Sequence, residues 1–86
     1  MSYVLIDNIS KEIIATNLEE AKDFIINLIE DIMNEMIDEE FNQENMQHIY
    51  DCQEIENDED FSDFLETLNH PYFLPYSYEP LNQINE

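Results

Sequence analysis

The chain has 86 residues and carries 22 acidic side chains against two lysines and no arginine, which gives a formal net charge of −20. A nucleic-acid-binding protein needs cations at the phosphates that it contacts, so this charge excludes most modes of direct binding to nucleic acid. Hydrophobic residues make up 43% of the chain and aromatic residues 12%, which is too rich for a disordered acidic tail. We therefore predict one small acidic domain over residues 1–86.

Length and cysteine content limit the class further. A chain of this size buries about 60–65% of its unfolded surface, so it builds one core. Cys52 is the only cysteine, which excludes an internal disulfide and favours a reducing compartment. The apolar run over residues 3–6 is too short for a membrane span, and no basic residue precedes it as in a signal peptide. We therefore expect a cytoplasmic protein without membrane contact.

The first elements in the chain are a hairpin and a long helix. Two apolar segments flank residues of turn composition, which predicts a β-hairpin over residues 3–15. Thr16 or Asn17 follows as a helix N-cap, with a glutamate three positions beyond either of them. Apolar residues then recur every third or fourth position, which predicts an amphipathic helix over residues 17–40. Its apolar stripe is interpreted as core, and a partner groove or a homodimer seam is the alternative.

The rest of the chain predicts shorter elements. Residues 38–45 form a polar break, and residues 46–55 fit either a strand or a helix, with the helix favoured. A short helix is predicted from the acidic stretch at 57–60 to Leu68. Residues 72–81, which are rich in aromatic side chains, are expected to be extended and to pack across the domain.

These elements together predict an α+β fold. It consists of the N-terminal hairpin, the main helix, one or two shorter helices and an extended aromatic tail. The shorter helices and the tail make up a C-terminal helical and extended region over residues 45–81.

The residues offer little catalytic chemistry. His48 and Cys52 would share a helix face, but neighbouring acids disfavour the thiolate, and a buried thiol is the more common role of such a cysteine. The chain has no glycine and no arginine, which excludes the usual phosphate-processing enzymes. We therefore predict a protein that is not an enzyme, has no catalytic residues and needs no cofactor.

Metal binding is the remaining small-ligand alternative, because clustered carboxylates suit Ca²⁺ or Mg²⁺. Asp58, Asp60, Asp63 and Glu66 form such a cluster in the sequence. However, the central glycine and the ligand spacing of an EF-hand loop are absent. The sequence therefore predicts no dedicated metal site, and a divalent-cation-binding protein stays as a minor alternative.

The size of the charge itself points to a function. Solubility needs a net charge of about 2–8 in a small domain, well below the magnitude found here. A compact chain of this length has a radius of gyration of about 12 Å and a diameter of roughly 30 Å. Spread over that diameter, the charge of −20 amounts to about one per 1.5 Å, close to the roughly 1.7 Å per charge along B-DNA.

In bulk charge, size and lack of cations, the chain resembles the small acidic DNA-mimic inhibitors of phages and mobile elements. Those inhibitors block restriction enzymes, CRISPR effectors, DNA glycosylases or repressors. The resemblance implies a basic nucleic-acid-binding protein as partner, such as a nuclease, CRISPR effector, glycosylase or repressor. It also implies the host cytoplasm as the place of action if a phage encodes the chain. Carboxylates three or four positions apart on a helix are about 5–6 Å apart, near the spacing of successive phosphates. The residues predicted to replace phosphates are Glu19, Asp23, Glu30, Asp31, Glu35, Asp38, Glu54, Glu56, Asp58, Glu59, Asp60 and Asp63.

The main alternative is an acidic adaptor or regulatory subunit. Such a protein would bind a basic partner without imitating DNA, with its acids in one patch and the aromatic tail as an apolar anchor.

Overall fold

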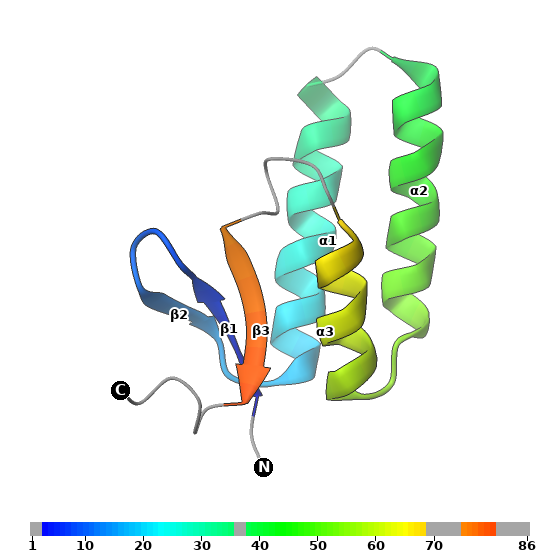
Figure 1. Ribbon diagram of the computed structural model, residues 1–86. Coiled ribbons are helices and arrows are strands. Elements are labelled where there is room, and N and C mark those ends of the chain that lie inside the picture. Colours follow the sequence, from blue (N-terminus) through cyan, green and yellow to red (C-terminus); the bar gives the residue numbers. More distant parts are fainter. Residues whose placement is uncertain (1–2, 36–37, 69–74, 81–86) are drawn as a thin grey trace.

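The computed structural model describes residues 3–35, 38–68 and 75–80 of the chain. Its elements, in chain order, are β1 (Tyr3–Asp7), β2 (Glu12–Ala15), α1 (Leu18–Glu35), α2 (Glu39–Glu54), α3 (Asp58–Thr67) and β3 (Tyr76–Pro80). The three strands form an antiparallel sheet in the order β2-β1-β3, and the three helices pack to one side of it (Figure 1). The predicted α+β fold, with its N-terminal hairpin and long helix, is confirmed.

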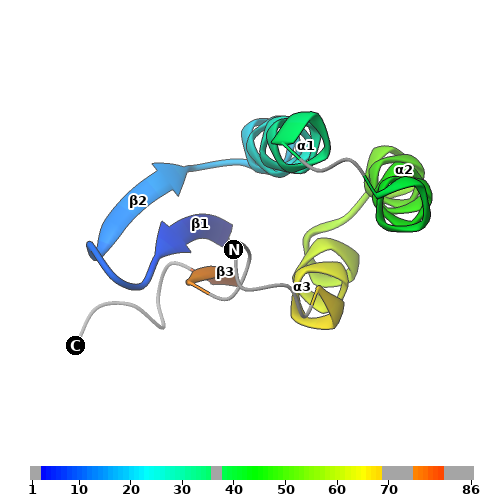
Figure 2. The same ribbon diagram turned by 90° about the horizontal axis from the view of Figure 1, so that it is seen from above.

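The molecule has a sheet layer and a helical layer. Seen from above, α1 and α3 lie next to the sheet and α2 lies farthest from it (Figure 2). The core lies between the layers, where Leu5 of β1 and Tyr78 of β3 contact the helices. Ile25 and Phe61 supply the helical side of the core and are fully buried. As a result, α2 presents an outer face that takes no part in covering the sheet.

The helix boundaries depart from the sequence prediction at one place. The main helix was predicted to run to residue 40, but α1 ends at Glu35 and α2 begins at Glu39. Asp38 is the N-cap of α2, because its carboxylate accepts hydrogen bonds from the backbone N–H groups of Glu40 (3.0 Å) and Phe41 (3.3 Å). A residue with an extended backbone and a capping side chain starts a new helix, so the predicted polar break over 38–45 is wrong.

The other local predictions are confirmed where the structure describes the residues, except that Pro75 lies in a turn and is not part of the predicted extended segment. Asn17 caps α1, since its side-chain oxygen accepts from the Glu20 N–H at 2.9 Å, and Asn57 caps α3 by accepting from the Asp60 N–H at 2.8 Å. The ambiguous segment 46–55 is helical up to residue 54. Of the segment predicted to be extended, β3 confirms 76–80, while 72–74 and 81 lie outside the described residues.

The apolar stripe of α1 forms core, as its spacing predicts. Ala21, Ile25, Ile29 and Ile32 are buried, and Met33 packs partly buried against them. Met36 and Ile37, the last positions of the predicted stripe, lie outside the described residues. The described part of the stripe is therefore used within the domain.

The dimensions refine the charge density. The radius of gyration is 12.9 Å, close to the expected value, but the molecule measures 42 × 27 × 18 Å, so its long axis exceeds the expected diameter. The charge of −20 then corresponds to about one charge per 2 Å of the long axis, compared with roughly 1.7 Å along B-DNA. The protein is thus slightly less densely charged than a duplex of equal length.

Candidate functional site

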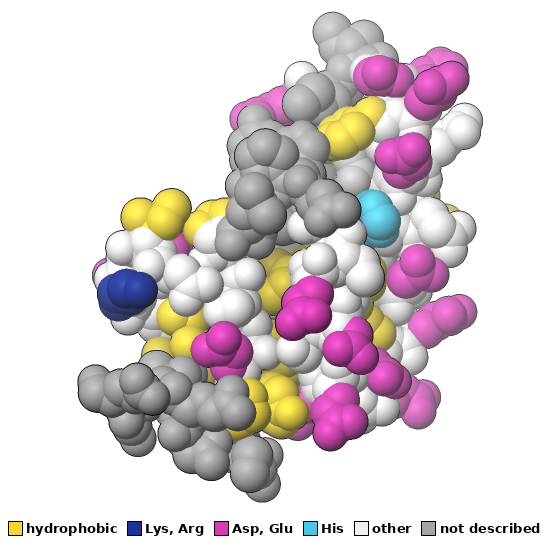
Figure 3. Space-filling model, in the orientation of Figure 1, with side chains coloured by type: hydrophobic (Ala, Val, Ile, Leu, Met, Phe, Trp, Pro, Cys, Tyr) yellow, Lys and Arg dark blue, Asp and Glu magenta, His cyan; other side chains and the backbone are white. Residues whose placement is uncertain are grey.

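The acidic side chains are concentrated on the helical layer. Among the described residues, every acid except Asp7, Glu12 and Glu79 belongs to a helix or to the segments that connect the helices. Figure 3 shows acidic side chains spread over the α2 and α3 side of the molecule. We call the acids of the three helices and their connections the acidic surface. The sheet side is much poorer in charge, so the molecule is electrostatically polarised.

The residues predicted to replace phosphates all belong to this surface, and all but the partly buried Asp58 are exposed. Three of them also have a role inside the fold. Asp38 caps α2, Asp60 accepts a hydrogen bond from the Asn57 side-chain amide at 2.9 Å, and Asp58 accepts one from the Tyr78 hydroxyl at 2.5 Å. These three carboxylates stabilise the structure, so the remaining predicted residues are the better candidates for contacting a partner.

The Asp58–Tyr78 bond joins the start of α3 to β3. Burial raises the pKa of Tyr78 well above its ordinary value, and the hydrogen bond to the Asp58 carboxylate and its negative charge raise the pKa further. The ring also stacks on Tyr3 at a centroid distance of 5.2 Å and meets Phe61 edge-on at 4.9 Å. Tyr78 therefore remains a neutral donor and holds the helical layer to the sheet.

The single lysine of the helices is used inside the fold. Lys22 of α1 donates from its ammonium group to the backbone carbonyls of Gln53 (3.1 Å) and Ile55 (2.7 Å), at the C-terminal end of α2. A cation at this end satisfies carbonyls that have no helical partner and interacts favourably with the helix dipole. The other lysine, Lys11, is exposed in the hairpin turn. The acids of the helices are thus opposed by the single charge of Lys22, which these neutral carbonyls hold in place but do not cancel.

The bonds of Lys22 to the end of α2 predict that the two lysines contribute differently to the free energy of unfolding. Lys22→Met should lower the free energy of unfolding by about 1–2 kcal/mol, because it leaves two carbonyls at the end of α2 without their charged donor. Lys11→Met, which changes the net charge equally, should have almost no effect. Urea denaturation of both variants measures the difference. Equal losses would mean that net charge, and not the cap, sets the effect of Lys22.

A hollow on α1 brings together acids that are far apart in the sequence. Glu19 and Asp23 of α1 lie beside Glu56, which belongs to the connection between α2 and α3. The hollow, which we call the α1 groove, has a volume of about 710 Å³. It is lined by Leu18, Glu19, Lys22, Asp23, Ile26, Gln53, Ile55 and Glu56. Three residues of the predicted set thus converge on one concave site.

The Cys52–His48 pair has no activated nucleophile. Cys52 is fully buried, and this burial raises the pKa of its thiol to about 11, although the charge of Lys22 lowers it and that of Asp23 adds a smaller increase. The His48 ring meets Phe64 edge-on at a centroid distance of 6.2 Å. The thiol is therefore protonated at neutral pH, chiefly because it is desolvated and only secondarily because acids are near.

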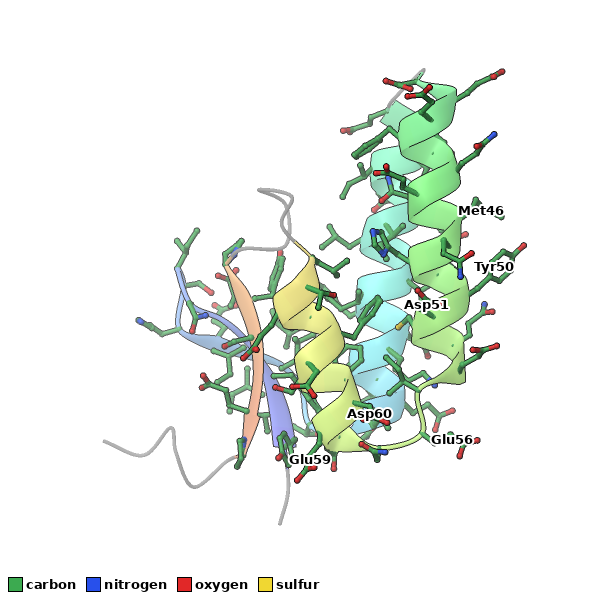
Figure 4. All side chains as sticks on the ribbon, turned by 45° about the vertical axis from the view of Figure 1, so that its right-hand side comes forward. Met46, Tyr50, Asp51, Glu56, Glu59 and Asp60 are labelled. Carbon is green, nitrogen blue, oxygen red and sulfur yellow. The ribbon has the colours of Figure 1, made fainter. Side chains whose placement is uncertain are left out.

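Sequence reasoning missed two exposed apolar side chains. Met46, Ile49 and Tyr50 all have the spacing expected of apolar positions on one helix face. Ile49 is buried, whereas Met46 is 40% and Tyr50 52% exposed on the outer face of α2 (Figure 4). Their order along the helix, four positions apart, places them on one stripe, and this stripe is recognisable only once the buried side of α2 is known.

Within residues 3–35, 38–68 and 75–80, no three His, Cys, Asp or Glu side chains come together in a way that could hold a metal ion. None of the described helices combines the length and the hydropathy that crossing a membrane requires. Comparison with models of protein families, with curated proteins and with solved structures finds no match to this chain.

Proposed function

We propose that this protein is an acidic inhibitor that binds the basic nucleic-acid-binding surface of another protein by imitating DNA. The observation that supports this proposal most directly is the concentration of exposed carboxylates on the helical layer, while the one lysine of the helices is bonded to backbone carbonyls. A partner therefore meets a strongly negative surface, in which the one positive charge of the helices is tied to the backbone. The partner belongs to the class of nucleases, CRISPR effectors, glycosylases and repressors, and the protein itself does not bind nucleic acid.

The mechanism follows from charge and spacing. Glu19, Asp23 and Glu30 lie on one stripe of α1 and are exposed. With a rise of about 1.5 Å per residue, the stripe extends over about 16 Å of the helix axis. Arginine and lysine side chains that normally hold phosphates would pair with these carboxylates, in part bidentately. The field of the whole molecule accelerates the encounter, and the bound inhibitor then blocks access of DNA.

Competition by DNA tests this function. The tagged protein is incubated with lysate of its source organism, a captured protein is purified, and their affinity is measured with and without a duplex oligonucleotide. We expect the duplex to displace the inhibitor competitively, and we expect the affinity to fall by at least tenfold between 50 and 300 mM salt, because exposed charges are screened. Binding that is indifferent to both duplex and salt would contradict mimicry.

An acidic adaptor that binds a basic partner without imitating DNA is the second candidate. The exposed Met46 and Tyr50 favour it, because an apolar centre surrounded by acids is typical of protein–protein interfaces (Figure 4). The two candidates differ in their response to Tyr50→Ala. An adaptor should lose most of its affinity with this change and remain bound in the presence of duplex DNA, whereas a mimic should lose little.

A further inference from the structure

The α1 groove combines an apolar floor with an acidic rim. Leu18, Ile26 and Ile55 are partly buried and pack against the core from beneath the groove. Glu19 and Asp23 contribute exposed carboxylates from α1. Glu56 contributes one from the connection after α2, where Figure 4 shows it. A volume of about 710 Å³ lies within the range of roughly 300–1,000 Å³ that is usual for ligand sites. The groove is therefore large enough for one side chain together with the peptide that carries it.

The carboxylates at the rim are available to a ligand. Within the part of the chain that the structure describes, Glu19, Asp23 and Glu56 accept no hydrogen bond, unlike the capping carboxylate of Asp38. Lys22 also lines the groove, but its ammonium group is held by two backbone carbonyls. The groove thus presents three carboxylates around apolar side chains, and its one cation, Lys22, is held by carbonyls of the groove wall, so the charged groups of the groove sum to −2.

We infer that the α1 groove receives an arginine side chain of the basic partner. An arginine matches both parts of the site, because its aliphatic stem can pack on the apolar floor while its planar guanidinium group donates to carboxylates on both sides. Lysine carries its charge at one point and cannot bond bidentately, so it fits the rim less well. The inference rests on the proposed function for the kind of protein that supplies the side chain. The choice of arginine rests on the residues of the groove itself.

A second copy of this chain does not supply the occupant. The sequence contains no arginine, and Lys11 is its only lysine besides Lys22. Two copies of a chain with a net charge of −20 also repel each other wherever their acidic surfaces meet. The arginine must therefore come from a different and basic protein.

Short peptides test the site without knowledge of the partner. The full chain, labelled for NMR, is titrated at low salt with acetyl-Gly-Arg-Gly-amide and with the corresponding lysine and citrulline peptides. With the arginine peptide, we expect the largest shifts at Leu18, Ile26 and Ile55, which form the floor. The lysine peptide should bind at least threefold more weakly, and the neutral citrulline peptide should cause no comparable shifts.

Two variants that each remove one negative charge distinguish binding in the α1 groove from attraction by the net charge of the molecule. Glu56→Gln should weaken arginine-peptide binding at least threefold, whereas Glu44→Gln, at an exposed position of α2 outside the groove, should leave it within twofold of the parent. Both variants remove one negative charge. Shifts spread evenly over the helices, equal effects of the two variants, equal affinity for the lysine peptide or no binding would each overturn the inference. None of these results bears on competition by duplex DNA, which tests the proposed function separately.

Discussion

Phe61→Ala is expected to lower the free energy of unfolding by about 3–5 kcal/mol, the usual cost of truncating a fully buried phenylalanine. Phe61 is 0% exposed, and its ring lies between Phe64 on the same helix and Tyr78 of β3, at centroid distances of 6.2 and 4.9 Å. A domain of this length has a total stability of about 4–13 kcal/mol. The substitution therefore removes a large part of the stability, and at the lower end of this range it leaves the protein partly unfolded even without denaturant.

Urea denaturation followed by circular dichroism measures this loss. Phe64→Ala serves as a matched control, because Phe64 lies on the same helix and is only partly buried. Its cost should be clearly smaller than that of Phe61→Ala, since less apolar surface leaves the core. A loss below about 1 kcal/mol for Phe61→Ala would show that the contact between α3 and the sheet is not the centre of the core.

Reversal of three charges on α1 is expected to lower the affinity for the basic partner by at least a hundredfold. The triple variant Glu19→Lys, Asp23→Lys and Glu30→Lys replaces three attractive contacts by repulsion along one stripe. Loss of even one close charge pair at an interface costs about 2–5 kcal/mol, so the effect on binding is large. The fold should lose no more than about 1 kcal/mol, because relief of repulsion among the remaining acids offsets the unfavourable lysine in the first turn of α1.

Calorimetric titration with the captured partner measures the affinity, and a thermal melt measures the stability. Glu12→Lys, at an exposed position of β2, is the control, because the sheet side lies away from the acidic surface. We expect it to change affinity less than threefold. If the triple variant bound as tightly as the parent, the partner would have to contact elements other than α1.

The hairpin and α1 could be predicted because each depends on a local sequence pattern. The boundary between α1 and α2 could not, because an apolar pattern that continues the helix competes there with a capping residue that starts a new one. Two apolar segments around a turn sufficed for the hairpin, and the recurrence of apolar residues every third or fourth position sufficed for α1. The end of α1 was missed because apolar residues continue at the helical spacing through Met36 and Ile37. The deciding residue was Asp38, whose capping bonds start α2 although the apolar pattern carries on.

The sequence could predict which acidic residues are candidates for the site, but not how they are arranged. Whether a carboxylate is free or bonded inside the fold depends on tertiary contacts. Asp58 and Tyr78 are 20 positions apart, and Lys22 reaches carbonyls more than 30 positions away. The meeting of Glu19 with Glu56 likewise depends on how α1 packs against α2. No periodicity in the sequence carries that information.

The order of strands in the sheet has a consequence for how the molecule folds. β3 pairs with β1, and the hydrogen bond between the side chains of Asn8 and Ser77 joins residues 69 positions apart. Closing so long a loop is slow compared with forming the local pair of α1 and α2. We therefore expect the helices to assemble early and β3 to join the sheet last, so that during synthesis the inner strand β1 has an unpaired edge until Tyr76–Pro80 have left the ribosome.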